Sequence, residues 1–511
     1  MKKFLLLGAA VLGLSTAASA QDVWEAHVDG HTYATDAETG VTCKNKWVVD
    51  RIHDSDRFLG LQFIKDYATK ARTAVIDPAR EKVYVGYSKS ATTTAEDGTE
   101  SSNDYAHLVV VDLETGEVLK ELPLTCDGTP ISGLLCANQV SMDDYGHVWI
   151  CGMYSDVNAK PAQIYVVEDF ETGACKNVGE WKLPDEETDA AGRIDYWDVV
   201  GDITGAEANA VCMGAVGTTA AGEKLCLYRW ELAQGATEWV ANEDDFAGYV
   251  SYYDGLDTYP ADQATWGSSC ATVRIVAEEG HVGSMFYVDG FTTCPSLYLS
   301  SLSLAESFAS APDLAPAVGC NGVDEFVLGE TPFIVYAEAQ YNVSPGCRIN
   351  VCQLGEGMTF EGMRKYWSLP EAGLGEVSDG GTRIHSIDTY KVVDKNGKEG
   401  VYILTYKNFN GLGLYLIAED GFDGSNHSIP SSDKIQIGGV IYKIDSNAKS
   451  AELYKVSTSL PERFTIPSQI DYNGEIYNVN KIANEAFYNN QNLISINIPN
   501  SVTTIGSSAF Y

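Results

Sequence analysis

Several signatures of catalysis are missing from this chain. It contains no C-x-x-C pair and no H-E-x-x-H, G-x-S-x-G or G-x-x-x-x-G-K-[ST] motif. These absences argue against zinc ribbons, zinc peptidases, serine hydrolases and P-loop nucleotide enzymes. The eight histidines are scattered along the sequence. We therefore predict no catalytic residue, no metal and no cofactor, and a protein that is not an enzyme.

Positive charge is also scarce. The chain has 34 Lys and Arg residues against 71 Asp and Glu residues, which gives a formal net charge of -37. A surface of this kind repels nucleic acid and anionic membranes, so no nucleic-acid partner is expected. No apolar run is long enough for a membrane-spanning helix, so no membrane span is expected either.

The N-terminus carries a targeting pattern. Met1-Lys2-Lys3 is a short basic start, Phe4–Leu14 is apolar, and Ala18-Ser19-Ala20 is an A-x-A cleavage site. This order is typical of a secretory signal peptide, which we assign to residues 1–20. The mature protein is thus predicted to be secreted or held at the cell surface, with the periplasm as the alternative.

Alternating β-type patterns fill the sequence from Val23 to about Asp420, with no long stretch of 3.6-residue period. The stretch Cys136–Val148 has a match at Cys270–Val282, 134 residues later. Between and around these two matches, one strand type recurs six times, each time followed by a second strand. Asp112–Gly116 is a typical turn between two such strands, because Asp and Thr side chains bond the turn backbone and Gly accepts φ > 0.

Six such units predict a mainly β protein, with a β-propeller of one four-stranded sheet per blade over residues 21–420. Seven blades or two stacked sandwiches are the alternatives. The early segment Cys43–Val49 is predicted to close the ring by completing the last blade. Residues 421–434 are rich in turn-forming residues and are predicted to be a linker.

The end of the chain has a shorter repeat. Ile482–Phe487 returns as Ile505–Phe510, 23 residues later. A period of this length predicts a solenoid, in which each unit buries its apolar face on the next. We assign it to residues 435–511 and expect strands within Ile435–Val456 to cap it.

This C-terminal part, about residues 464–511, resembles the BspA-like leucine-rich repeats of bacterial surface proteins. The resemblance implies a short curved solenoid in a surface-exposed or secreted protein, with adhesion as the role of several relatives. Since the sequence stops inside a repeat, a fragment of a longer protein is an open alternative. The first ~400 residues resemble uncharacterised secreted propeller-like domains. The resemblance of the repeats is carried by these segments: Phe464–Ile470, Ile482–Phe487, Leu493–Pro499, Val502–Ile505 and Ala509–Phe510. It implies that the core of the repeats consists of Phe487, Leu493, Ile496, Ile498, Val502 and Ile505. It also implies that Ser495 and Asn497 lie on the concave face.

Two further patterns point to a ligand. Arg193–Asp198 and Arg383–Asp388 share R-I-x-x-x-D. At the mouth of a propeller channel, an Arg and an Asp can bind a carboxylate or a sugar hydroxyl. The alternative is a salt bridge between blades. We select Arg193, Asp198, Arg383 and Asp388 as candidate ligand-binding residues.

A long irregular stretch rich in Tyr and Asp suits stacking on sugar rings, because long loops carry function more often than strands do. Its alternative is an outer strand. Its candidate residues are Tyr252, Tyr253, Tyr259 and Trp266.

These observations favour an exported, non-enzymatic recognition or adhesion protein that binds a glycan, or a protein of a host or neighbouring cell. One alternative is a propeller enzyme, a polysaccharide lyase or glycosidase, in which Asp195, Asp198 or Asp388 would converge. A second alternative is a structural scaffold in a cell-envelope complex.

Overall fold

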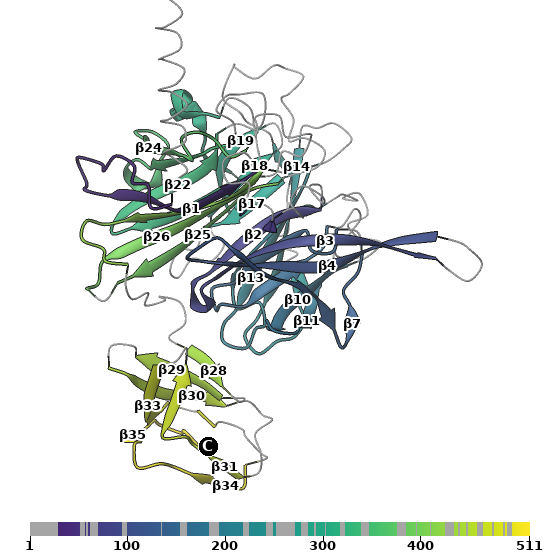
Figure 1. Ribbon diagram of the computed structural model, residues 1–511, viewed down its shortest axis with the longest axis vertical. Helices are drawn as coiled ribbons and strands as arrows, with labels where there is room; N and C mark the ends of the chain where they lie inside the picture. Colours follow the sequence, from purple (N-terminus) through teal and green to yellow (C-terminus); the bar gives the residue numbers. More distant parts are fainter. Residues whose placement is uncertain are drawn as a thin grey trace, which may run out of the picture. The chain divides into compact units, whose positions relative to one another are not determined.

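The computed structural model shows a mainly β chain that folds as two compact units (Figure 1). The first unit comprises Met1–Lys391 with Glu399–Phe422, and the second comprises Asp423–Tyr511 with Val392–Lys398. The structure describes residues 29–511 except 52–56, 58–59, 62–69, 95–99, 134, 154–160, 183–193, 218–223, 242–248, 252–270, 277–284, 291–292, 302, 317–321, 339–346, 376–384, 395, 409, 425–433, 438–439, 446–447, 457–462, 473–474, 484–485, 488–492 and 511. The predicted signal peptide lies outside this range. The described part contains no helix with the length and apolar character that crossing a membrane requires.

The first unit contains six sheets, and five of them are built from strands in chain order. Short 3-10 helices η1(Pro78–Arg80), η3(Phe308–Ser310), η4(Pro312–Leu314) and η5(Glu356–Met358) lie in the connections. The first sheet contains β2(Ala71–Asp77), β3(Lys82–Thr94), β4(Glu100–Asp112) and β5(Val118–Pro123). The second contains β8(Gln139–Met142), β9(Val148–Cys151), β10(Ala162–Asp169) and β11(Ala174–Trp181), and β6(Thr125–Cys126) and β7(Thr129–Pro130) extend it beyond β11. The third contains β12(Trp197–Gly201), β13(Ala210–Gly217), β14(Lys224–Leu232) and β15(Val240–Ala241), and β16(Tyr249–Ser251) also pairs with β14. The fourth contains β17(Ala271–Ile275), β18(Met285–Gly290), β19(Thr293–Leu299) and β20(Leu304–Glu306). The fifth contains β21(Val323–Leu328), β22(Thr331–Ala337), β23(Ile349–Gln353) and β24(Arg364–Leu369).

The sixth sheet joins the two ends of the unit. It contains β25(His385–Val393), β26(Glu399–Lys407) and β27(Gly411–Ala418), and its fourth strand is β1(Thr42–Asp50). β1 pairs antiparallel with β27 from Thr42↔Ala418 to Asp50↔Gly411. The predicted pairing of the early segment with the last sheet is therefore confirmed.

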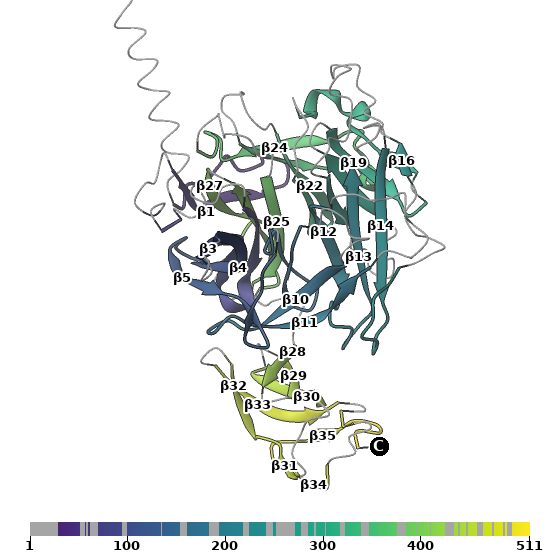
Figure 2. The ribbon, with the colours of Figure 1, turned by 90° about the vertical axis from the view of Figure 1, so that its right-hand side faces the viewer.

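Consecutive sheets from the first to the sixth share apolar cores, and Figures 1 and 2 show how the strands of these sheets are arranged. Between the second and third sheets the core is rich in tryptophan, and the rings of Trp181 and Trp197 stack with centroids 4.7 Å apart. The sixth sheet contacts the first, where the Tyr406 hydroxyl donates to the Ala71 carbonyl at 2.8 Å. Each sheet thus has a neighbour on both sides, in cyclic order. The other shared cores are represented by Val75 with Val148, Val211 with Phe286, Tyr287 with Ile334, and Phe333 with Val401.

The predicted Asp-to-Gly turns have a common structure. In Asp112–Gly116 the Asp112 carboxylate accepts the backbone N–H groups of Glu114 and Thr115 and the Thr115 hydroxyl. Gly116 has φ +69°, the left-handed region that favours glycine. A Cβ atom at Gly116 would lie 2.7 Å from a ring atom of Trp47.

The strand register excludes one cysteine contact that the spacing in the sequence allows. Cys212 and Cys226 lie symmetrically about a turn in the sequence, which suggests that they face each other across a hairpin. In the observed register Cys212 lies opposite Trp230 and Cys226 lies opposite Val216. The turn is thus displaced from the midpoint between the two cysteines, and this separates them along the ladder.

The second unit is also built from strands. β28(Lys434–Ile437), β29(Val440–Asp445), β30(Ser450–Val456), β32(Gln469–Tyr472), β33(Glu475–Ile482) and β35(Thr504–Ile505) form one sheet, and β31(Arg463–Thr465) pairs with β34(Ser495–Asn497) in another. The pairs β30–β33, β33–β35 and β31–β34 are parallel.

The implied core of the repeats is largely observed. Phe487 is buried, and Leu493, Ile496, Ile498 and Val502 pack partly buried against the same cluster. Ile505 is 50% exposed, so its assignment to the core is wrong. Its strand β35 pairs on one side only, with β33, among the described strands.

We expect Trp47→Ala to lower the free energy of unfolding of the first unit by about 3–5 kcal/mol, the usual cost of deleting a large buried ring. Trp47 is fully buried in β1, and its indole N–H donates to the Leu113 carbonyl at 2.8 Å, which ties the last sheet to the first. Urea unfolding monitored by circular dichroism measures the loss. Val240→Ala, at an exposed residue of β15, is the control. A loss below about 1 kcal/mol would contradict a closing role for β1.

Candidate functional site

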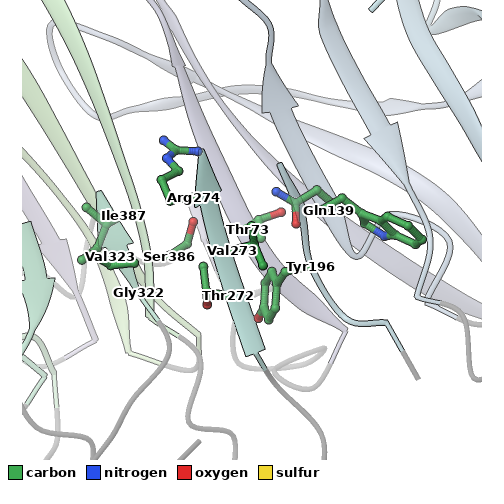
Figure 3. Close-up of a pocket in the computed structure, with 11 residues that line it drawn as sticks. Thr73, Gln139, Tyr196, Thr272, Val273, Arg274, Gly322, Val323, Ser386 and Ile387 are labelled. Atoms are coloured by element: carbon green, nitrogen blue, oxygen red, sulfur yellow. The ribbon is translucent and has the colours of Figure 1, made fainter. Parts of the chain in front are cut away.

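The first strands of the six sheets meet around a small cavity. We call β2, β8, β12, β17, β21 and β25 the inner strands. Each contributes lining residues, directly or from the residue before the strand, to a cavity of about 40 Å³ (Figure 3). The lining residues are Thr73, Gln139, Tyr196, Trp197, Thr272, Val273, Arg274, Gly322, Val323, Ser386 and Ile387.

Aspartates link neighbouring inner strands in a repeated way. In each link, a carboxylate of one inner strand, or of the residues just after it, accepts a backbone N–H group of the next inner strand. Such a bond satisfies a donor of the strand edge without a continuous sheet. The links are Asp388 with Ile76 N–H at 2.8 Å, Asp144 with Gly201 N–H at 2.7 Å, and Asp198 with Ile275 N–H at 2.6 Å.

Other polar side chains complete the links. The Thr73 hydroxyl accepts the Val140 N–H at 2.7 Å and donates to the Asn138 carbonyl at 3.1 Å, which joins β2 to β8. The Thr389 hydroxyl donates to the Glu325 carbonyl at 3.1 Å, which joins β25 to β21. Every neighbouring pair of inner strands is therefore bridged, the β17–β21 pair by the arginine described next.

Arg274 of β17 is the charged centre of this region. Its Nε and Nη2 atoms donate to both carboxylate oxygens of Asp324, at 2.8 and 2.7 Å. Its Nη1 atom lies 3.2 Å from Asp198, and its Nη2 atom lies 3.5 Å from Asp388. The Arg274 side chain is 21% exposed. One guanidinium thus holds three carboxylates from three other inner strands.

This region contains more carboxylates than arginines, and the pKa values of Asp388, Asp144 and Asp198 are raised. Burial raises the pKa of Asp388 to about 7 despite the opposing effect of Arg274. Burial likewise raises the pKa of Asp144 to about 6 and that of Asp198 above its ordinary range. Burial tends to lower the pKa of Arg274, but the adjacent carboxylates raise it well above its usual value. Asp388 is therefore partly protonated near neutral pH.

A second ion pair lies in the same unit. Arg72 of β2 donates to Asp195 at 2.9 Å, and both side chains are buried. The enzyme alternative required Asp195, Asp198 or Asp388 to converge. Asp198 and Asp388 do meet, on Arg274, whereas Asp195 is engaged by Arg72.

One group of described residues has the geometry of metal ligands. Donor atoms of Asp143, His147 and Asp202 lie within 4.8 Å of one another. His147 Nδ1 lies 2.9 Å from Asp143, and the same carboxylate accepts the Ile203 N–H from the next sheet at 2.9 Å. Burial tends to lower the pKa of His147, but Asp143 and Asp202 raise it overall. With its Nδ1 atom beside both carboxylates, His147 makes this group a link between the second and third sheets.

The sequence-predicted residues divide into two groups. Asp198 and Asp388 lie on inner strands and share Arg274. Their ligand-binding role stays a prediction, as does that of the remaining six, which lie outside the described residues: Arg193, Arg383, Tyr252, Tyr253, Tyr259 and Trp266.

Sequence reasoning missed Arg274, Asp324 and Asp144. The signal that could have found Arg274 and Asp324 is position within the repeat, because both lie on the first strand of their unit, as do Asp198 and Asp388. Alignment of the six units by their first strands would have brought all four residues to one place.

We expect the free energy of unfolding to rise as the pH falls from 8 to 5, by on the order of 2 kcal/mol. The folded-state pKa values of Asp388 (about 7) and Asp144 (about 6) lie above that of an unfolded aspartate. The native state therefore retains protons that the unfolded chain has lost, and this stabilisation disappears as the pH rises through these values. Urea titrations at several pH values measure the slope of the free energy of unfolding against pH. Asp388→Asn should reduce this slope, whereas Asp313→Asn, at an exposed residue of η4, should leave it unchanged. Equal stability of the wild type at pH 5 and pH 8 would refute the raised pKa values of Asp388 and Asp144.

Arg274→Met should destabilise the first unit by about 3–5 kcal/mol at pH 7.5, because it leaves buried carboxylates without their cation. The loss should shrink at pH 5, which lies below the pKa of about 7 of Asp388, so that this carboxyl group is protonated. Arg364→Met is the control, since the Arg364 side chain, which pairs with Asp36, is 38% exposed against 21% for Arg274, and its loss should be smaller. Similar losses for the two variants at pH 7.5 would argue against a central role for Arg274.

Comparison with known proteins gives its clearest result for the second unit. Residues 442–511 match the family model of the BspA type leucine rich repeat region (6 copies). No curated protein matches the chain. A leucine rich cell surface protein from Faecalibacterium prausnitzii is 32% identical over 15% of this chain and 20% of that chain, with a TM-score of 0.14.

Two other solved structures align with a larger share of the chain. A protein of unknown function from Dyadobacter fermentans is 10% identical, with a TM-score of 0.37, over 68% of this chain and 95% of that chain. A GH43_1 enzyme from Xanthomonas citri is 8% identical, with a TM-score of 0.28, over 70% and 92%. The family match, together with the parallel pairing of β33 with β35 and of β31 with β34, identifies the second unit: the C-terminal part of this chain is a BspA-type leucine-rich repeat region.

Proposed function

We propose that this protein is an exported, non-enzymatic recognition protein that binds a glycan or a protein of a host or neighbouring cell. The observation that carries the proposal is the BspA-type repeat region at residues 442–511. Proteins with such repeats are typically surface-associated, and a repeat array exposes a broad face rather than a closed cleft.

The first unit adds a second recognition platform in this proposal. We interpret its six sheets in cyclic order as the blades of a six-bladed β-propeller, and the parallel strands of the second unit as the start of a solenoid. In a propeller the strands converge on a central channel, and loops at its ends are free to vary. The cavity between the inner strands would be the end of that channel.

The engagement of the central carboxylates supports a role without catalysis. Asp388 uses one oxygen on the Ile76 N–H and the other on Arg274. Asp198 is engaged in the same way by the Ile275 N–H and Arg274. A carboxylate that acts as a general acid, base or nucleophile must be free to reach the substrate. These two are held by the scaffold instead.

The second unit offers an exposed polar face on β34, with Arg463 of the paired strand β31 beside Ser495. Ser495 and Asn497 are exposed on β34, and Ile494 beside them is 70% exposed. Small polar groups next to an exposed apolar side chain suit contact with a neutral glycan or an uncharged protein surface. The formal charge of the whole chain disfavours an acidic partner.

A propeller enzyme that acts on polysaccharide is the alternative, favoured by one observation. Asp388, with a pKa of about 7, could donate a proton near neutral pH. Reducing-sugar and unsaturated-product assays on a panel of polysaccharides test this alternative. Turnover that falls at least 100-fold in Asp388→Asn would establish it.

Binding of residues 21–511 to a glycan array and to purified extracellular-matrix proteins tests the proposal. We expect saturable binding to at least one probe, weakened at least about tenfold in the double variant Ser495→Arg/Asn497→Arg if the repeat region makes the contact. Lys449→Glu, elsewhere in the same unit, is the control for surface charge. Absence of binding to every probe, together with turnover of a polysaccharide, would reject the proposal.

A further inference from the structure

One pair of cysteines is aligned across two neighbouring strands of the second sheet. In the parallel ladder between β6 and β11, Cys126 lies directly opposite Cys175. Neighbouring strands of a sheet lie roughly 4.7–4.9 Å apart, and the Cα atoms of a disulfide are usually about 4.4–6.8 Å apart. The backbone spacing at this pair therefore falls within the range that a disulfide bond requires.

Both side chains also lie on the same face of the sheet. Cys175 is a buried member of the apolar cluster that contains Val148 and Val167, and Cys126 packs partly buried against the same cluster. Burial raises the pKa of the Cys175 thiol to about 12, and the nearby Cys126 adds to this rise. Two cysteines that are opposite each other on one face direct their Cβ atoms to the same side, which a disulfide also requires.

This alignment distinguishes the pair from the other described cysteines. In the ladders of the described strands, no other two cysteines are partners; Cys43 lies opposite Ile417, Cys151 opposite Ile164, Cys212 opposite Trp230 and Cys352 opposite Ile334.

The strand that carries Cys126 is held by few backbone bonds. Its ladder with β11 has only two register pairs, Thr125 with Ala174 and Cys126 with Cys175. Beside them, the Thr125 N–H donates to the Gly173 carbonyl at 3.0 Å. β6 and β7 nevertheless form the outer end of the second sheet (Figure 1), where they cover an edge of β11 that would otherwise present unpaired backbone groups. A covalent bond at Cys126 would fix this cover in place.

An oxidant can reach one of the two thiols. Both are free in this structure. Cys126 is half-buried, and the four residues after it, Asp127–Pro130, are exposed. Thiol–disulfide exchange depends on access to the attacking sulfur. Cys126 is therefore the residue that meets the oxidant, and Cys175 reacts through Cys126.

We propose that Cys126 and Cys175 form a structural disulfide when the protein meets an oxidising environment that contains a disulfide-bearing oxidant, either a protein oxidoreductase or oxidised glutathione. Cys126 Sγ attacks the oxidant and forms a mixed disulfide, and Cys175 Sγ then attacks Cys126 Sγ. Each attack releases one thiol of the oxidant, which together take up the two electrons and two protons of the cysteines. The inference rests on the export included in the proposed function, because disulfides persist outside the cytoplasm.

Peptide mapping of purified residues 21–511 tests the pairing. The protein is equilibrated with oxidised and reduced glutathione, unfolded in iodoacetamide and cleaved before its aspartates. This cleavage places Cys126, Cys136 and Cys175 on three peptides: Asp112–Cys126, Asp127–Met142 and Asp169–Pro184. We expect more than half of Cys126 to be linked to the peptide of Cys175, and excess dithiothreitol to separate the two peptides.

Thermal unfolding gives a second readout. The oxidised protein should have a Tm higher than that of the reduced protein by on the order of 5 °C, because the bond joins residues far apart in the sequence and restricts the unfolded chain. This difference should disappear in Cys126→Ser and in Cys175→Ser. Cys136→Ser is the matched control, since Cys136 belongs to the same apolar cluster but lies in a turn, and it should keep the difference. Each variant is compared with itself in two redox states, so a general loss of stability does not affect the result.

The outcomes separate this inference from the proposed function. Free thiols at both positions after oxidation, or a link from Cys126 to Cys136 or to any other cysteine, would overturn the pairing and leave the recognition function intact. Residues 1–511 are also produced in a bacterial host. Recovery of that chain uncleaved and reduced in the cytoplasm, while purified residues 21–511 form the bond in glutathione, would refute export and support the pairing.

Discussion

The first unit depends on a set of bonds between strands that do not pair with one another. Neighbouring inner strands belong to different sheets, so backbone ladders cannot join them. Side chains do so instead, with Asp388, Asp144 and Asp198 each capping an N–H group of the next strand. Arg274 then binds three carboxylates at once. The apolar cores hold adjacent sheets together, while this polar ring fixes how they meet at the centre.

The cost of such a ring is electrostatic. Several carboxylates share one guanidinium away from bulk water, so at least one of them holds its proton up to neutral pH. In some proteins, buried charges contribute to conformational specificity rather than to stability. Here Asp198 and Asp388 also each accept a backbone N–H group of a particular neighbouring strand, which defines the order and height of these strands.

Much of the fold follows from local pattern. The alternating runs and the Asp112–Gly116 type of turn mark the strands because the chemistry that forms them is contained in a few neighbouring residues. The pairing of β1 with β27 followed from counting strands per unit. The relation of Cys212 to Cys226 was misjudged because register depends on where the turn begins, which symmetry of spacing does not determine. Arg274 was missed for a different reason: one charged residue in a strand carries no local sign that three distant acids will surround it.

The position of β1 has a consequence for how the protein reaches its folded state. Thr42 and Ala418 are 376 residues apart, yet they lie side by side in one sheet. The segment made first by the ribosome must therefore wait, without its partner, until almost the whole unit has been synthesised. Contacts of such long range are slow to form. Closure of the first unit by β1 therefore cannot precede synthesis of its partner strand, which ends at Ala418.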